Sequence, residues 1–172
     1  ANLVRSAPLF AFTTYGLDSL AVKSDLDIDI VAGGRLEQLQ VTVEDHLDIL
    51  IVCGGFRCSL EQHQALNKKL READKHRVIL GGLWNGSIAL AHAGLLEGKS
   101  CSLHPDNHAY MGEMFANVQI AKRTYSVEEY RATSAGAVSA LEMMLELIVH
   151  FQGQDTVRAI REILSCDQVA EH

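Results

Sequence analysis

The chain has 172 residues, of which 48% are hydrophobic and 22% charged, and this composition fits one globular domain with a substantial buried core. The formal net charge of -7 excludes a broad phosphate-binding face, so the domain itself is not expected to bind nucleic acid. Neither a signal-peptide pattern nor an apolar run long enough to span a bilayer occurs, which predicts a soluble cytoplasmic protein without membrane contact.

Short strands are expected in the first part of the chain. Residues 9–14 and 27–31 have strand-like composition around a polar turn, and residues 21–23 predict a further short strand. Residues 47–53 form a branched apolar run that stops at two glycines. Such a run is typical of a parallel strand buried on both faces, so it is the clearest strand of this region.

A helix is expected after this strand. Ser59 and Gln62 form a capping-box pattern at its start, and its apolar stripe contains Leu66, Leu70 and Ala73. Strand and helix then alternate through residues 78–80, 85–93, 100–103 and 106–115. This alternation predicts an α/β domain with a mostly parallel central sheet and right-handed crossovers.

Two strands and two helices are expected in the last third of the chain. The strands are predicted at residues 118–121 and 130–132. Residues 135–151 have apolar side chains at helical spacing, and residues 156–164 predict a final amphipathic helix capped by Asp155.

The composition gives no sign of a second domain or of a covalent framework. We expect a single domain over residues 1–170, and we interpret the final Glu171-His172 as a purification-tag remnant. The cysteines fit neither a zinc ribbon nor a disulfide pattern, so we expect free and mostly buried thiols at Cys53, Cys58, Cys101 and Cys166.

The most informative segment is residues 81–87, GGLWNGS, where an apolar strand turns directly into a helix. Strand-to-helix elbows of this kind usually lift a nucleophile above the sheet, beside the first backbone N–H groups of the helix. Here the chain's only tryptophan, Trp84, stands at the bend. An indole has no nucleophilic atom, but it offers an aromatic face for cations and an N–H donor. The elbow therefore predicts molecular recognition rather than covalent catalysis.

Three polar clusters follow predicted strands, and we expect them to converge. In a parallel α/β sheet, ligands bind outside the carboxyl ends of the strands. The clusters supply the candidate ligand-binding residues, which are Gly54, Gly55, Phe56, Arg57, Trp84, Asn85, Gly86, His104, Asp106 and Asn107.

Each main candidate also has a structural interpretation, and both stay open. Gly55 with its neighbouring glycine either makes a tight turn or presents N–H groups to an anion. Arg57 is either a solvated charge or a bidentate carboxylate ligand. Trp84 either fills the core or contacts a ligand. His104 is either a structural hydrogen-bonding residue or a ligand contact. Asn85 either contacts a ligand or simply caps the helix.

Neither a metal site nor a cofactor is expected. His104 and His108 have i, i+4 spacing, but Asp106 lies off their common face and Cys101 precedes them on a predicted strand. The other histidines before the terminus are expected to be solvated or helix-surface residues, and they are His46, His63, His76, His92 and His150.

From residue 47 to about residue 164 the sequence resembles the ThiJ/PfpI-type domain, a relative of class I glutamine amidotransferases. This domain forms the amino-terminal sensor half of a branch of AraC-family transcriptional regulators. The resemblance is carried by residues 48–55, 80–87, 93–98, 103–107 and 134–145. The version with tryptophan and asparagine at the elbow is similar to regulators that sense arginine, glycine betaine or carnitine.

The resemblance implies a flavodoxin-like three-layer sandwich and a homodimer. In enzymes of the wider superfamily, a cysteine occupies the position of Trp84, and a histidine near the position of His104 is its partner. Since the nucleophile is absent, the resemblance implies a non-catalytic domain that senses a small zwitterionic nitrogen metabolite. Family members normally begin with a further strand and helix and bind DNA through a carboxyl-terminal helix-turn-helix domain, neither of which we find in this chain.

The expected ligand geometry places a carboxylate near the N–H groups of Gly55 and Gly86, with Arg57 nearby, and an ammonium against Trp84. One alternative is a ThiJ/PfpI-class hydrolase or glyoxalase that uses Cys53 or Cys58 with His104, which requires a reactive thiolate. Another is a dimerisation scaffold with a vestigial pocket.

Overall fold

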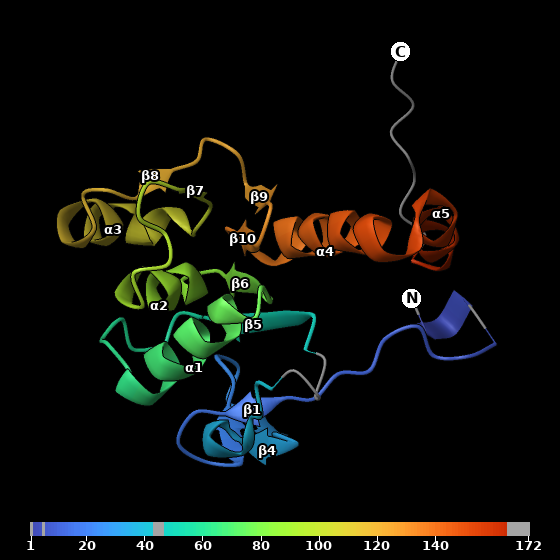
Figure 1. The fold of residues 1–172 in the computed structure, drawn as a ribbon, viewed down its shortest axis with the longest axis horizontal. Helices are drawn as coiled ribbons and strands as arrows, with labels where there is room; N and C mark the ends of the chain where they lie inside the picture. The colour runs from blue at the N-terminus through green and yellow to red at the C-terminus, as the bar shows by residue number, and fades with distance from the viewer. Residues whose placement is uncertain (1, 5, 43–46, 165–172) are drawn as a thin grey trace. The chain divides into compact units, whose positions relative to one another are not determined.

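The computed structural model describes residues 2–4, 6–42 and 47–164 (Figure 1). It divides into two compact units, one formed by Thr13–Met143 and the other by the chain up to Phe12 together with the chain from Met144. None of the described helices is long and apolar enough to cross a membrane. The predicted surface histidine His46, the thiol of Cys166 and the segment 171–172 lie outside the described residues.

A four-stranded sheet, in the order β5-β6-β10-β9, forms the largest sheet of the described residues. Its strands are β5 (Ile49–Cys53), β6 (Ile79–Leu83), β9 (Tyr125–Glu128) and β10 (Arg131–Ser134). β5 and β10 both run parallel to β6, and β9 pairs antiparallel with β10, so the predicted mostly parallel sheet is confirmed. The register pairs Leu83 with Cys53 on one side and with Ser134 on the other. The carboxyl ends of the three parallel strands therefore meet at one edge.

Strand β5 differs from its prediction in burial. Its first four residues are half-buried and Cys53 is exposed, so the expectation of a strand buried on both faces is wrong. The physical reason is its position, because β5 is at the edge of the sheet and has β6 as its sheet partner within the described residues. Strand β9 has no counterpart among the predicted strands.

Two helices follow β5 and β6 along the chain. Helices α1 (Gln64–Lys75) and α2 (Gly86–His92) pack against each other and against β6, and Figure 1 shows both beside β5 and β6. The predicted apolar stripe of the first helix is buried at Leu66, Leu70 and Ala73.

The start of α1 differs from the capping pattern in the sequence. His63 is the N-cap, because its Nδ1 accepts the N–H of Leu66 at 3.1 Å. The Ser59 hydroxyl accepts the N–H of Glu61 at 3.1 Å within a local turn. The predicted cap at Ser59 is therefore wrong, since a different side chain meets the first free N–H groups of the helix.

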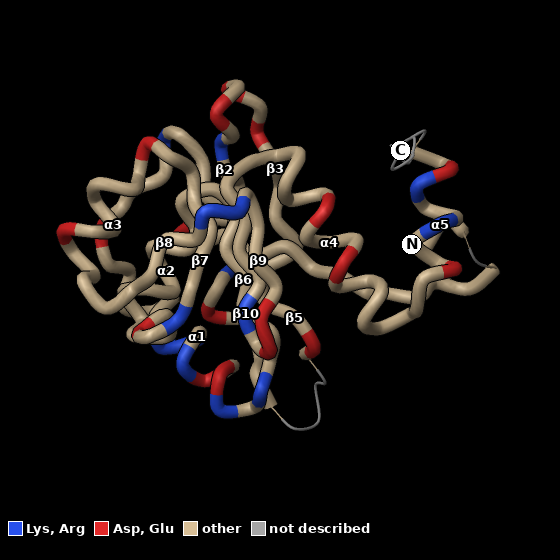
Figure 2. Tube along the Cα trace, turned by 90° about the horizontal axis from the view of Figure 1, so that it is seen from above, with Lys and Arg blue, Asp and Glu red and all other residues tan. Residues whose placement is uncertain are grey.

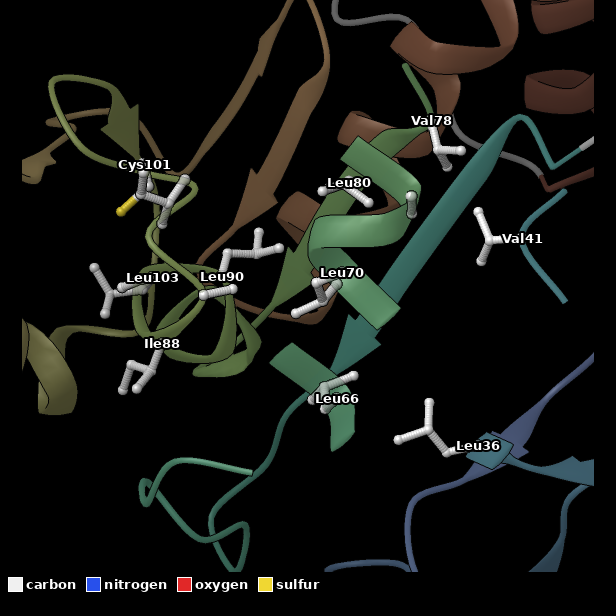
Figure 3. Packing of buried hydrophobic residues seen from close by; sticks show 14 of the residues in the cluster. Leu36, Val41, Leu66, Leu70, Val78, Leu80, Ile88, Leu90, Cys101 and Leu103 are labelled. Carbon is white, nitrogen blue, oxygen red and sulfur yellow. The ribbon is translucent and has the colours of Figure 1, made fainter. Parts of the chain in front are cut away.

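Apolar side chains from the helices, the sheet and the connecting segments form one core in the larger unit. Figure 3 labels ten members of this core, namely Leu36, Val41, Leu66, Leu70, Val78, Leu80, Ile88, Leu90, Cys101 and Leu103. Complete burial of one leucine or isoleucine side chain contributes about 1.5 to 3 kcal/mol. The core therefore fixes the positions of α1 and α2 against the sheet that carries the elbow.

Three two-stranded sheets complete the strand pairing of the described residues. They pair β1 (Tyr15–Gly16) with β4 (Gly34–Arg35), β2 (Ala21–Lys23) with β3 (Asp29–Val31), and β7 (Ser100–Cys101) with β8 (Gln119–Ile120). The predicted strands at residues 21–23, 27–31, 100–103 and 118–121 are confirmed with these bounds, mostly shorter than predicted.

The strand predicted at residues 9–14 is wrong, because this segment has no strand structure. The side-chain oxygen of Asn2 accepts the N–H groups of Leu9 and Phe10, at 2.8 Å and 2.9 Å. Its side-chain nitrogen donates to the Phe10 carbonyl at 2.7 Å. These backbone groups are thus bonded to an asparagine side chain, and the nearby strand begins at Tyr15.

The remaining helices follow the predictions with shifted ends. The helix predicted at residues 106–115 is divided into η3 (Pro105–Asn107) and α3 (His108–Met114), and two longer helices are α4 (Ala137–Gln152) and α5 (Gln154–Ile163). Short 3-10 helices also occur at η1 (Asn2–Val4) and η2 (Leu36–Gln38). The cap predicted at Asp155 is wrong, because Gly153 is the N-cap of α5 and Asp155 lies in the first turn, bonded to Arg158 at 3.0 Å.

Candidate functional site

The turn from β6 into α2 is strained at Trp84, whose φ angle is 61°. A bulky residue at positive φ costs about 1 to 3 kcal/mol and persists only where the surrounding structure enforces it. Two backbone hydrogen bonds hold this turn. The Trp84 N–H donates to the Ser134 carbonyl at 2.9 Å, and the Trp84 carbonyl accepts the His104 N–H at 3.3 Å. The predicted elbow is present, with Trp84 at its bend.

Three aromatic rings meet at this elbow, and we call Phe56, Trp84 and His104 the aromatic cluster. The Trp84 and His104 rings are stacked, with centroids 4.1 Å apart and planes inclined by 6°. The Phe56 ring lies edge-on to both, at 4.7 Å from Trp84 and 6.0 Å from His104. The three residues follow β5, β6 and β7, so the structure brings together candidates from all three predicted clusters.

The aromatic cluster is accessible from solvent. Phe56 is 69% exposed, whereas Trp84 and His104 are half-buried. His104 covers one face of the indole and Phe56 also packs against it, so the exposed aromatic surface comes mainly from the Phe56 ring, with part of Trp84. Such surface attracts cations, by about 0.5 to 1 kcal/mol at exposed sites and about 2 kcal/mol when the cation is desolvated.

Asn85 joins the elbow to the segment after β5. Its Oδ1 accepts the Gly55 N–H at 3.0 Å, and its Nδ2 donates to the Gly55 carbonyl at 3.0 Å. Asn85 stands at the N-cap of α2, but its side chain makes no capping hydrogen bond. The Gly55 N–H is therefore already bonded, and the carboxylate contact expected at this group is not available in this arrangement.

Gly54 and Gly86 allow the two segments to approach each other closely. A Cβ atom at Gly54 would overlap the Asn85 Oδ1, and one at Gly86 would overlap the Val52 carbonyl oxygen. The Gly54 N–H donates to the Leu83 carbonyl at 3.0 Å. These glycines thus shape the site through backbone packing.

Arg57 and the backbone of Phe56 are bonded to aspartates from the β2–β3 hairpin (residues 21–31). The Asp25 carboxylate accepts the N–H of Phe56 at 2.8 Å and the N–H of Arg57 at 3.0 Å. The Arg57 guanidinium donates to the Asp27 carboxylate at 2.7 Å. Neither aspartate was among the site residues predicted from the sequence. Asp25 lies 31 positions before Phe56 along the chain, and no spacing pattern connects them.

The remaining two candidates are close to His104 along the chain. The Asp106 N–H donates to the His104 Nδ1 at 3.4 Å, and the Asp106 carboxylate lies 3.4 Å from the same nitrogen. Asn107 is half-buried and precedes α3 without a capping hydrogen bond. The Asn107 N–H donates to the His104 carbonyl at 2.9 Å. The structure therefore connects both residues with His104, Asp106 through its backbone and carboxylate and Asn107 through its backbone alone.

The other histidines include two with structural roles. His63 caps α1, and the His92 Nε2 lies 2.9 Å from the Leu60 carbonyl, which also accepts the Tyr110 hydroxyl at 3.1 Å. Both residues, expected as solvated or helix-surface histidines, are half-buried and bonded. His76 and His150 are exposed.

His108, which has i, i+4 spacing with His104, is bonded to the backbone. Its Nε2 lies 3.1 Å from the Leu103 carbonyl, so this nitrogen has a structural partner. Within the described ranges no three His, Cys, Asp or Glu side chains are placed to hold a metal ion.

The described cysteines are free, but burial was predicted correctly only for Cys101. Cys53 and Cys58 are exposed at the surface, because the end of β5 and the segment after it lie at the sheet edge. Surrounding atoms nevertheless remove water from both thiols and raise their pKa values, and the Asp25 charge raises that of Cys58 further. Burial raises the pKa of Cys101 to about 11. A thiol with a raised pKa is mostly protonated at neutral pH and is a poor nucleophile.

A shallow depression elsewhere contains none of the candidate residues. It is lined by Ala91, Glu97, Met114, Phe115, Ala116, Asn117 and Val118. Its lining comes from α2, from the segment between α2 and β7, from the end of α3 and from the segment before β8. The candidate site is therefore defined by the side chains of the aromatic cluster and not by this depression.

Residues 10–150 of the chain match the DJ-1/PfpI family. The chain is 31% identical to the HTH-type transcriptional regulator GbdR of Pseudomonas aeruginosa, over 98% of this chain and 45% of that protein. It is 29% identical to the HTH-type transcriptional regulator CdhR of the same organism, over 91% of this chain and 45% of that protein. The chain therefore spans about half the length of these curated relatives.

Solved structures with the same fold include a regulator and a DJ-1 protein. An AraC family transcriptional regulator from Pseudomonas putida is 34% identical, with a TM-score of 0.84 over 95% of this chain and 85% of that chain. Drosophila melanogaster DJ-1beta is 22% identical, with a TM-score of 0.76 over 91% of this chain and 83% of that chain. These likenesses confirm the predicted flavodoxin-like α/β sandwich.

Proposed function

Since the chain belongs to the DJ-1/PfpI family, we propose that it is the non-catalytic effector-binding domain of an AraC-family transcriptional regulator. The regulators among its relatives support the regulatory part of this proposal. The observation that carries the non-catalytic part is Trp84, which stands at a strained elbow with φ 61°. At that position a serine or cysteine would act as a nucleophile, whereas an indole can only bind.

The proposed effector is a small zwitterionic nitrogen metabolite, such as glycine betaine, carnitine or arginine. Its cationic group would contact the aromatic cluster, since aromatic rings recognise quaternary ammonium and guanidinium groups. Its carboxylate would contact Arg57 and the backbone beside it, because a planar guanidinium pairs well with carboxylates. Gly54, Gly55, Asn85 and Gly86 would then shape the site rather than touch the ligand.

The partners follow from the same proposal. This domain would form a homodimer, and promoter DNA would be bound by a helix-turn-helix domain outside these 172 residues. The net charge of -7 supports this division, because it disfavours phosphate binding by the domain itself.

Thermal unfolding tests the effector class. A ligand at one hundred times its Kd stabilises the folded state by about 2.7 kcal/mol, which raises the Tm of a domain of this size by about 5 to 10 °C. We expect this shift with at least one of the three compounds, a loss of the shift in Trp84→Ala and a partial shift in Trp84→Phe. The proposal fails if a broad set of zwitterions and cations leaves the Tm of the wild-type domain unchanged.

The enzyme alternative depends on Cys53 or Cys58. The raised pKa values of both thiols argue against it, because catalysis requires a thiolate. The His104 Nδ1 is also close to the Asp106 N–H, at 3.4 Å. Mild iodoacetamide labelling with mass spectrometry separates the two functions, since a selectively fast cysteine would support an enzyme. A stable dimer in light scattering without any ligand would instead favour the scaffold alternative.

A further inference from the structure

A carboxylate already occupies the backbone beside the aromatic cluster. Asp25 accepts two consecutive N–H groups, those of Phe56 at 2.8 Å and Arg57 at 3.0 Å. Consecutive backbone N–H groups that converge on one point form a nest for anions, and carboxylates are common occupants. The approach is close, because a Cβ atom at Gly55 would come within 2.5 Å of the Asp25 carboxylate. The segment after β5 therefore binds carboxylates, and its present occupant comes from this chain.

A second carboxylate from the same hairpin is bound next to the first. The Arg57 guanidinium pairs with Asp27 at 2.7 Å, and both side chains are largely exposed. Figure 2 shows the acidic residues at the tip between β2 and β3. Exposed ion pairs are weak and exchange readily with dissolved ions. Arg57 therefore adds affinity for carboxylates without holding Asp27 permanently.

Little else holds the β2–β3 hairpin in place. Its strands pair with each other, and no other strand of the described residues pairs with them. Its apolar side chains remain largely in solvent, since Leu26 is 80%, Ile28 59% and Val31 76% exposed. None of them belongs to the buried core. The carboxylate bonds of the tip are thus major attachments of this hairpin.

Phe56 connects the occupied nest with the aromatic cluster. Its N–H is bonded to Asp25 at 2.8 Å, while its ring lies 4.7 Å from the Trp84 ring. A cation over these rings and a carboxylate at this N–H would contact the same residue from its two ends. Glycine betaine, in which one carbon separates the two charges, fits this short separation.

We propose that the Asp25 carboxylate is an internal competitor, which the carboxylate of the effector displaces from the Phe56 and Arg57 N–H groups. This inference rests on the proposed function, because it takes the effector to be a zwitterion. One carboxylate replaces another, so both N–H donors stay bonded while the hairpin loses its attachment. Release of the β2–β3 hairpin is then the conformational signal of effector binding.

The test compares Asp25→Ala with a matched control on the same hairpin, Asp29→Ala, whose carboxylate pairs with Lys23 at 3.2 Å and not with Arg57. Three probes are titrated against each protein by amide NMR shifts: glycine betaine, choline, which lacks the carboxylate, and acetate, which lacks the cation. Removal of the Asp25 carboxylate is expected to increase the affinity for glycine betaine and for acetate about tenfold, or by about 1.4 kcal/mol. Choline affinity, and all affinities of Asp29→Ala, are expected to stay at wild-type values.

Hydrogen exchange of the wild-type domain provides the second measurement, since it needs no substitution. Glycine betaine is expected to speed exchange at residues 21–31 and to slow it at Phe56 and Arg57. Slower or unchanged exchange in the hairpin on binding would overturn the displacement, even if Asp25→Ala failed to fold.

The outcomes separate this inference from the proposed function. Wild-type binding of glycine betaine with equal or weaker binding by Asp25→Ala would overturn the competition and leave the sensor function standing. If Asp25→Ala binds acetate more tightly but neither glycine betaine nor choline binds to any of the proteins, Asp25 does compete for the carboxylate site. The proposal of a zwitterionic effector would then be overturned. Failure of all three probes with every protein would overturn the competition, and the proposed function would fail with it if the broad set of zwitterions and cations also leaves the Tm unchanged.

Discussion

The Trp84 and His104 rings are stacked almost in parallel, with centroids 4.1 Å apart. In enzymes that pair a nucleophile with a general base, a histidine within hydrogen-bond reach takes a proton from the nucleophile. Here the imidazole covers one face of the indole, so its contact is with a ring and not with a reacting atom. The pair thus fixes an aromatic surface at the turn.

Replacement of His104 by alanine is expected to uncover the indole. Aromatic pairs contribute about 0.5 to 1.5 kcal/mol beyond the burial of their area, so His104→Ala is expected to lower stability by about this amount. Because Trp84 is the only tryptophan, the fluorescence emission maximum reports on it alone and is expected to move to longer wavelength. His104→Phe keeps a stacking ring and is the control. An unchanged emission maximum in His104→Ala would contradict the stacked arrangement.

Replacement of Asn85 by alanine is expected to destabilise the domain by about 2 to 4 kcal/mol. The change leaves the N–H and the carbonyl of the buried Gly55 without their partners, and each lost partner costs about 1 to 3 kcal/mol. Asn107→Ala is the control, since Asn107 also precedes a helix without a capping bond, and it is expected to change stability by less than about 0.5 kcal/mol. Denaturant unfolding of the two variants measures the difference, and equal losses would refute the assigned role of Asn85.

Alanine is expected to have opposite effects at two helical glycines. At Gly86 a Cβ atom would overlap the Val52 carbonyl oxygen, so Gly86→Ala forces α2 away from β5 and costs about 1 to 3 kcal/mol. At Gly112, within α3, a Cβ atom meets nothing within 4 Å, so Gly112→Ala is expected to stabilise by about 0.5 to 1 kcal/mol. Thermal unfolding of the two variants measures both changes in stability. A Gly86→Ala variant as stable as the wild type would argue against the close approach of Gly86 to the Val52 carbonyl.

The stability of the domain is expected to fall at alkaline pH through Cys101. Burial raises the pKa of this thiol from 9.0 to about 11, so the folded state keeps the proton that the unfolded state releases first. The contribution is therefore fully present below pH 9 and is lost as the pH rises toward 11, by about 2 to 3 kcal/mol. Cys101→Ala removes this titration. The free energies of unfolding of the two proteins, measured from pH 7 to 11, are expected to converge, and parallel curves would contradict the prediction.

Local patterns in the sequence were sufficient for much of the fold. The apolar stripe of Leu66, Leu70 and Ala73 predicted a buried helix face, and the structure buries all three residues. The order of strands and helices predicted the parallel sheet, and thereby the convergence of Phe56, Trp84 and His104. These features depend on periodicity and chain order, which a single sequence contains.

Features that depend on distant partners were missed. Asp25 bonds Phe56 across 31 positions and Asn85 bonds Gly55 across 30, and neither pair has a local signal. The cap at Ser59 failed for a related reason, because a serine that bonds its own turn resembles a helix cap in sequence. Side-chain bonds to a backbone from another part of the chain require the fold before they can be recognised.

The left-handed backbone conformation at position 84 is stabilised by main-chain hydrogen bonds to Ser134 and His104 and does not depend on the Trp84 side chain. The turn therefore presents any residue placed there at the same point beside Phe56. This makes position 84 an attachment point for engineering, since a cysteine introduced there and labelled with an environment-sensitive dye would be located inside the candidate site. Because the dye replaces the indole that the proposed effector contacts, it would report the polarity of the site in the effector-free protein.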